Sequence, residues 1–80
     1  MIAKVYITLK SGVLDPQGKT VQHALESLAF NEVRDVRIGK YIEIRLADAD
    51  QKVSEKRVKE MCEKLLANTV IESYRYEIVS

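Results

Sequence analysis

Aliphatic side chains alternate with polar or aromatic ones over residues 3–9. This period of two is typical of a β-strand with one buried face. Residues 41–46 and 71–79 alternate in the same way, and we expect a strand at each. Residues 33–38 are also rich in β-forming side chains, and the Gly39-Lys40 pair that follows them suits a tight hairpin turn. The pattern therefore predicts four strands.

Two other segments repeat at helical spacing. Asp15-Pro16 is typical of an N-cap followed by proline at the first helical position, and it predicts a helix that ends near Phe30-Asn31. The apolar stripe of this helix consists of Val21, Ala24, Leu25 and Leu28. Asp48-Ala49-Asp50 offers caps for a second helix, which we expect to end at Asn68. Its apolar stripe consists of Val58, Met61, Cys62, Leu65 and Leu66.

The predicted order of elements is β-α-β-β-α-β over a single domain, residues 1–80. This order indicates an α+β protein of the ferredoxin-like kind, in which two helices cover one face of an antiparallel sheet. The other face stays open. Its polar and aromatic mixture suits either the docking of another subunit or an ordinary solvated surface. The residues expected on it are Lys4, Tyr6, Thr8, Tyr41, Glu43 and Arg45.

Composition narrows the class of protein further. The 80 residues are 46% hydrophobic and 31% charged, which is enough apolar content for a globular fold. So short a chain gains stability by association, and we expect a homodimer or a dimer of dimers. The net charge is +1 with both signs interspersed, which argues against nucleic acid as a partner. One cysteine and no long apolar run favour a cytoplasmic protein that does not enter a membrane.

One motif resembles a phosphate-binding loop. Gly12 precedes Gly18-Lys19-Thr20, but five residues separate the two glycines where the P-loop has four. Asp15-Pro16 also removes an amide donor and adds negative charge where phosphates would lie. A capped turn from loop to helix explains these residues better than nucleotide binding does.

Other candidate chemistry is equally sparse. His23 lies on the polar side of the first predicted helix without ligand-type partners nearby in the pattern. Cys62 lies on an apolar stripe, where a free cysteine usually acts as a small hydrophobic residue. The carboxylates form no evident acid/base pair. We therefore expect no catalytic, cofactor-binding or metal-binding site in this chain.

RNA-recognition domains share the predicted order of elements, but their third strand carries a Gly- and aromatic-rich signature. The corresponding residues 41–46 hold one aromatic side chain, Tyr41, with Glu43 close to it. RNA binding is therefore disfavoured. A stand-alone module that senses a small molecule or binds a protein remains the alternative function.

Several runs of this chain occur together in one known family: residues 9–19 (LKSGVLDPQGK), residues 36–40 (VRIGK) with Glu43, Cys62, residues 65–68 (LLAN), Ile71-Glu72 and Tyr74. These runs resemble those of the PurS family, the small S subunits of phosphoribosylformylglycinamidine (FGAM) synthase. The similarity extends over essentially the whole chain in the same order. Ala29 departs from it, because the family often has Gly there, and Thr69 stands where Pro is common.

The resemblance implies a role in de novo purine biosynthesis. The enzyme of that family is an ATP-dependent, glutamine-hydrolysing carbon–nitrogen ligase. A large synthetase subunit and a glutaminase subunit carry its chemistry, so we expect no activity from the S subunit alone. The implied role is an accessory one, to bridge the other two subunits, and a part in handing ammonia between them stays open.

Loops outside the regular elements are the expected contact points for such partners, because they reach beyond the packed layers. Lysine and arginine side chains there can pair with acidic groups and set the register of an interface. The residues predicted to contact partners are Lys10, Gly12, Asp15, Pro16, Gln17, Gly18, Arg37, Gly39, Lys40 and Glu43.

Overall fold

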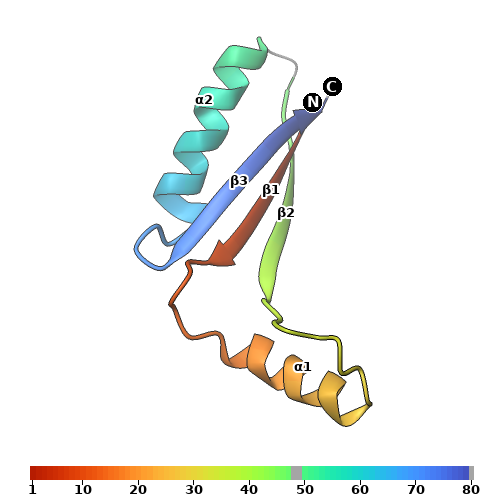
Figure 1. Cartoon of the computed structure of the whole chain (residues 1–80). Helices are drawn as coiled ribbons and strands as arrows, with labels where there is room; N and C mark the ends of the chain where they lie inside the picture. The colour runs from red at the N-terminus through yellow and green to blue at the C-terminus, as the bar shows by residue number, and fades with distance from the viewer. Residues whose placement is uncertain (48–49, 80) are drawn as a thin grey trace.

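The computed structural model describes residues 1–47 and 50–79 of the chain. Its elements follow in the order β1 (Ile2–Leu9), α1 (Pro16–Ser27), β2 (Gly39–Arg45), α2 (Gln51–Met61), η1 (Cys62–Leu66) and β3 (Glu72–Val79). The short η1 is a π-helical turn that continues α2. Figure 1 shows the sheet and α2 together, with α1 at the far end of the molecule.

The three strands form one antiparallel sheet in the order β2-β1-β3. In the centre of the sheet Val5 lies opposite Ile42 on one side and Tyr76 on the other. This register puts the aliphatic residues of β1 on the same face as the apolar residues of both neighbours. The predicted strands over residues 3–9, 41–46 and 71–79 are therefore confirmed to within two residues.

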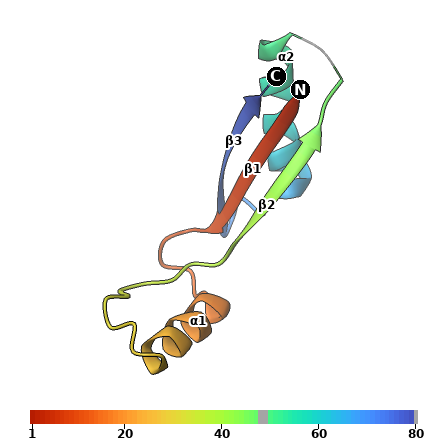
Figure 2. The same cartoon turned by 90° about the vertical axis from the view of Figure 1, so that its right-hand side faces the viewer.

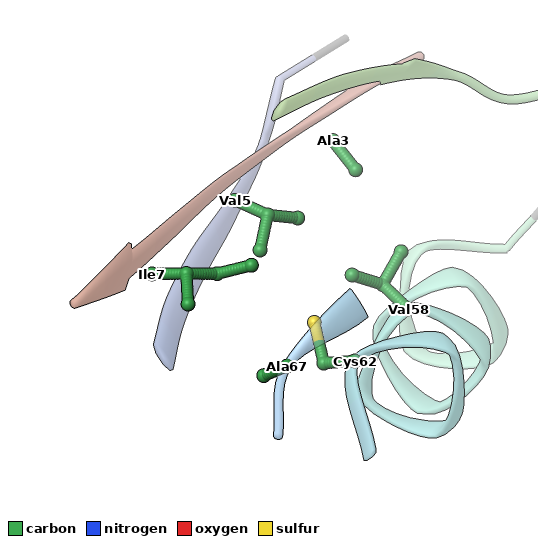
Figure 3. Close-up of a cluster of buried hydrophobic side chains, with 6 residues drawn as sticks. All are labelled: Ala3, Val5, Ile7, Val58, Cys62 and Ala67. Atoms are coloured by element: carbon green, nitrogen blue, oxygen red, sulfur yellow. The ribbon is translucent and has the colours of Figure 1, made fainter. Parts of the chain in front are cut away.

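The core lies between this face and α2. Figure 3 shows Ala3, Val5 and Ile7 of β1 pointing toward Val58 of α2 and Cys62 at the start of η1. All five side chains are buried, and Ala67 closes the cluster. The apolar stripe predicted for the second helix therefore provides the core contacts through Val58 and Cys62. Cys62 is a small core residue, as expected from its position.

The helix α2 begins at its N-cap, Asp50, whose carboxylate accepts hydrogen bonds from the backbone N–H groups of Lys52 at 2.8 Å and Val53 at 3.4 Å. The other two predicted caps, Asp48 and Ala49, lie outside the described residues. At the other end, the N–H of Ala67 donates to the carbonyl of Cys62 at 2.9 Å, and η1 ends at Leu66, two residues before the expected Asn68.

The helix α1 extends away from the sheet. Together with its two connections to the sheet it forms what we call the arm, residues 10–38, which extends beyond the lower end of the strands in Figures 1 and 2. The Cα radius of gyration is 16.0 Å. A compact domain of this length is expected to have about 12 Å. Among the described residues α1 makes no extensive packing contact with another element.

The α+β class predicted from the sequence is confirmed, because a three-stranded antiparallel sheet with two helices is consistent with a ferredoxin-like fold. One detail differs in the placement of the helices. Only α2 lies on the face of this chain's sheet, whereas α1 lies beyond its end. The amphipathic pattern of α1 identifies its apolar side but not the surface that this side packs against.

The prediction of a strand at residues 33–38 was wrong, since this segment is irregular. The predicted Gly39-Lys40 hairpin turn was also wrong, because both residues begin β2 and lie opposite Thr8 and Ile7. The physical reason is a contact with a residue far away in the sequence. The N–H of Ile38 donates to the carboxylate of Asp15 at 2.9 Å, so a side chain takes the place that a neighbouring strand would fill.

Candidate partner-binding site

The two connections between arm and sheet, residues 10–15 and 36–40, run side by side at the end of the strands. We call this region, with the first turn of α1, the junction. All of the residues predicted to contact partners lie in it except Glu43, which is on the open sheet face. Sequence reasoning therefore selected residues that the fold brings together.

Asp15 holds the junction in place. One carboxylate oxygen accepts a hydrogen bond from the N–H of Gly18 at 2.9 Å, which caps α1. The other accepts from the N–H of Ile38 at 2.9 Å, which ties the cap to the segment leading into β2. These two bonds, to Ile38 and Gly18, hold the pKa of the Asp15 carboxyl below its ordinary value, and the nearby Arg37 guanidinium adds to this effect.

Three glycines determine the path of the backbone here, one through its conformation and two through close contacts. Gly12 has φ +87°, the left-handed region that other residues rarely adopt. A Cβ on Gly18 would lie 2.4 Å from the carbonyl oxygen of Val36, and one on Gly39 would lie 2.4 Å from that of Ile7. Gly18 and Gly39 are therefore needed for close packing, whatever they contact outside the chain.

Two of the three cationic side chains of the junction already interact with other residues of the chain. The Arg37 guanidinium donates a hydrogen bond to the carbonyl of Leu9, which links the two connections. The Lys40 ammonium lies 3.5 Å from the Glu72 carboxylate at the start of β3. In contrast, the side chain of Lys10 makes no ion pair among the described residues. Its backbone N–H donates to the carbonyl of Ile71, and its carbonyl accepts from the N–H of Val13. Lys10 is thus the predicted cation that is most available to a partner.

A cleft of about 240 Å³ opens on one side of the junction. The ends of β1 and β2 form its floor, Asp15, Pro16 and Gln17 form one wall, and Lys40 with Glu72 forms another. A second hollow of about 180 Å³ lies between the loop with Gly12 and the segment with Arg37. The junction therefore offers concave surfaces with mixed polar and apolar linings, which suit protein contacts.

The open face of the sheet is the second candidate surface. Tyr6 lies at its centre, and the centroid of its ring is 5.1 Å from that of Tyr41. The guanidinium carbon of Arg75 lies over the Tyr6 ring, 3.9 Å from the centroid. The Tyr6 hydroxyl donates to Glu77 at 3.0 Å, and the Tyr41 hydroxyl donates to Glu43 at 2.7 Å. The predicted composition of this face is confirmed.

These hydrogen bonds affect the titration of both phenols. A carboxylate acceptor stabilises the protonated phenol, so the bond to Glu43 raises the pKa of Tyr41 to about 12. The bond to Glu77 raises the pKa of Tyr6 in the same way. The open face therefore keeps its tyrosines neutral and hydrogen-bonded, which orders the side chains before any partner binds.

Sequence reasoning missed Ile38 and Glu72 in the junction and Arg75 and Glu77 on the open face. The alternation of residues 71–79 contained the signal for the last two, because Arg75 and Glu77 alternate with apolar residues that face the core. Ile38 and Glu72 gave no local signal. They enter the junction only through contacts with residues far away in the sequence.

The described residues hold no group of three or more histidine, cysteine, aspartate or glutamate side chains that could bind a metal ion. Cys62 is buried, and burial raises the pKa of its thiol, so it is poorly suited to act as a nucleophile. Over residues 1–47 and 50–79 no helix has the length and apolar character to cross a membrane.

Fold and site together define a small α+β protein whose distinctive exposed features are the hollowed junction and the ordered polar and aromatic face of its sheet. The family model described as PurS, phosphoribosylformylglycinamidine (FGAM) synthase, matches residues 2–80. The chain therefore belongs to the PurS family, as its sequence resemblance indicates.

Individual relatives agree with this assignment. The chain is 64% identical over 75 residues to the phosphoribosylformylglycinamidine synthase subunit PurS of Bacillus subtilis, a match covering 94% of this chain and 88% of the relative. The corresponding subunit of Synechocystis is 47% identical over 96% of this chain and 77% of the relative.

Solved structures of PurS proteins match this chain over nearly its whole length. The B. subtilis PurS crystal structure matches with a TM-score of 0.86 at 61% identity, over 99% of this chain and 98% of that one. The structure of PurLQS from Thermotoga maritima contains a chain that matches with a TM-score of 0.83 at 30% identity, over 99% of both chains. An arm that projects from the sheet is therefore compatible with the folds of these relatives.

Proposed function

We propose that this chain is the accessory S subunit of FGAM synthase and that it bridges the synthetase and glutaminase subunits of that enzyme. Membership of the PurS family makes it a subunit of FGAM synthase in purine biosynthesis. The bridging role is the step beyond this. The T. maritima relative supports it, because its solved structure is that of PurLQS.

The observation that carries the proposal is the presence of two separate, ordered contact surfaces on one small chain. The junction lies at the end of the sheet, and the open face lies along the strands. Each is held by hydrogen bonds within the chain, through Asp15 in the first and through Tyr6 and Tyr41 in the second. A bridging subunit needs two such surfaces, and preorganisation reduces the entropic cost of using them.

Within the junction, the cations have different roles in this proposal. Lys10 is free to meet an acidic group of a partner, whereas Arg37 first stabilises the arm. Lys40 presents its charge over the cleft while it pairs with Glu72, and its side chain remains 62% exposed. Electrostatic pairs of this kind set the register and the rate of association more than the affinity.

Ammonia transfer between the two catalytic subunits is the finer part of the proposal. The chain contributes to it by fixing the distance and orientation of the subunits that it joins. The cleft of the junction then faces a partner and is closed by it. Nothing in this role requires a nucleophile or a metal ion on the S subunit.

The test is a pull-down of the synthetase and glutaminase subunits with purified variants of this chain. We expect Lys10→Glu to weaken capture of at least one partner about tenfold or more, because like charges that meet in an interface are costly. Lys56→Glu is the matched control, since Lys56 is exposed on α2 at a distance from both surfaces.

Lys40→Glu alone is ambiguous, because the new carboxylate would lie against Glu72 and disturb the junction. The double variant Lys40→Glu with Glu72→Lys restores the ion pair while it exchanges the two charges. We expect this variant to unfold at the temperature of the wild-type chain and still to lose partner binding. Normal capture of both partners by Lys10→Glu and by the double variant would contradict the role of the junction.

A further inference from the structure

The strand β3 forms one edge of the sheet. It pairs with β1 alone, in the strand order β2-β1-β3, and Figure 2 shows the three strands side by side with β3 on the outside. In an antiparallel sheet, alternate residues of an edge strand direct their N–H and C=O groups away from the sheet. The outer edge of β3 therefore offers a row of backbone donors and acceptors with which another strand can pair.

This edge lacks the features that usually prevent such pairing. Edge strands of soluble proteins are commonly short, or they carry lysine, proline or a bulge. The sequence of β3, ESYRYEIV, contains neither lysine nor proline. Its eight residues lie one to one opposite residues of β1, from Glu72 opposite Leu9 to Val79 opposite Ile2, so the strand has no bulge. The strand is therefore regular and long enough to accept a neighbour.

Two rows of side chains flank this edge. Tyr74, Tyr76 and Ile78 face the core but are only half-buried at its margin. The rings of the two tyrosines are stacked, with centroids 6.5 Å apart. On the open face Arg75 and Glu77 are exposed, and Arg75 makes no ion pair among the described residues. A strand that pairs with β3 would thus add apolar contacts on one face and charged contacts on the other.

The sequence of β3 is complementary to itself. When two copies run antiparallel about a two-fold axis at Tyr76, Arg75 of each copy lies opposite Glu77 of the other, and Tyr74 lies opposite Ile78. A register shifted by one residue places the apolar row against the charged row. A two-fold axis at Arg75 or at Glu77 places like charges opposite each other, which is unfavourable. Of the two-fold registers of β3, only the axis at Tyr76 pairs opposite charges and keeps the two faces matched.

We propose that β3 pairs antiparallel with β3 of a second copy about a two-fold axis at Tyr76. The two three-stranded sheets then form one continuous sheet. The contact is isologous, so each favourable pair of residues occurs twice. It involves neither the arm nor the junction, and the proposal does not depend on the bridging role.

Charge reversal in the full-length chain tests this pairing by sedimentation velocity at micromolar concentration. We expect Arg75→Glu to halve the mass of the wild-type assembly, because two pairs of like charges then meet in one contact and the dissociation constant rises about 100-fold. Glu77→Arg should act in the same way. A mixture of these two variants should recover the wild-type mass, since the two chains then carry opposite charges at both positions.

Glu43→Arg is the matched control. Glu43 and Glu77 each accept a hydrogen bond from a tyrosine hydroxyl on the open face, but Glu43 lies in β2, at the other edge of the sheet. Glu43→Arg should therefore keep the wild-type mass. The proposal would be overturned by a monomeric wild-type chain, by an unchanged mass in Arg75→Glu, by an equal loss of mass in the control, or by a mixture that fails to recover.

Cross-linking tests the register without changing a charge. Opposite residues of antiparallel strands have Cα atoms about 4.5–5.5 Å apart, a separation that a disulfide can span. With oxidised glutathione as the oxidant, Tyr76→Cys should form a disulfide between copies. Tyr74→Cys, on the same face but opposite Ile78, should not. Cross-linking of neither variant, or of both equally, would exclude a two-fold axis at Tyr76.

Discussion

Ala29 is the one residue other than glycine that adopts a left-handed backbone among the described residues, with φ 70°. It follows α1, and the hydrogen bonds around it are those of a Schellman motif. The N–H of Ala29 donates to the carbonyl of Glu26 and that of Phe30 to the carbonyl of Leu25, each at 3.0 Å. Glycine is the usual residue at this position, since it lacks the Cβ that makes the left-handed region costly.

We therefore expect Ala29→Gly to raise the free energy of unfolding by about 0.5–1 kcal/mol. Ala24→Gly is the matched control within α1, where added backbone freedom should lower stability by about 0.5–1 kcal/mol. Chemical denaturation of both variants measures the two effects. Equal destabilisation by the two glycines would show that the conformation of Ala29 costs nothing.

At the scale of elements, Asp15 couples the start of α1 to the segment before β2. Its folded-state pKa is lower than its unfolded-state pKa, so the folded protein binds the proton more weakly. The stabilisation by Asp15 is thus complete above the ordinary aspartate pKa of about 3.9 and is lost as the pH falls through the folded-state value.

Asp15→Asn should accordingly reduce stability at pH 7 and have a progressively smaller effect as the pH falls below about 3.9, where the unfolded chain begins to bind the proton more strongly than the folded protein does. Denaturation midpoints of the two proteins across this range provide the measurement. Asp35→Asn serves as the control, since among the described residues the Asp35 carboxylate accepts no hydrogen bond and should show little difference at either pH. A difference for Asp15→Asn that is constant with pH would exclude the charge as its cause.

Sequence patterns predicted most elements because the signals are local. Alternation identified the strands, and the Asp15-Pro16 cap placed the start of α1 correctly. Residues 33–38 misled the prediction, since β-propensity depends on whether a neighbouring strand is available. Here the backbone N–H of Ile38 donates its hydrogen bond to the carboxylate of Asp15 instead of to a neighbouring strand. The junction could be predicted from its loop residues, whereas Glu72 enters it only through the register of β3.

The whole molecule is elongated, with Cα extents of 49 × 26 × 14 Å. Because the two ends of the long axis are far apart, different partners could bind at them without steric conflict. A bridging subunit of this shape should affect the transfer of nitrogen more than the ATP-dependent step itself.

In the reconstituted three-subunit enzyme, we expect a variant that weakens only the glutaminase contact to lose most glutamine-dependent activity and to retain more activity with high ammonium. Lys10→Glu and the Lys40→Glu, Glu72→Lys double variant are the candidates. The purified chain alone should neither hydrolyse ATP nor release ammonia from glutamine. Parallel loss of both activities would instead place the defect in the synthetase contact, and turnover by the chain alone would contradict its accessory role.

The double attachment of the arm has a mechanical consequence. Both connections pass through the junction and are held there by the hydrogen bonds of Asp15 and Arg37, so α1 can turn relative to the ends of β1 and β2 only if these bonds shift or break. A molecule bound along the arm and a molecule bound in the cleft would therefore alter each other's affinity. Thermodynamic linkage requires this influence to be equal in both directions. If the chain bridges two subunits as proposed, binding of one of them would then change the affinity for the other.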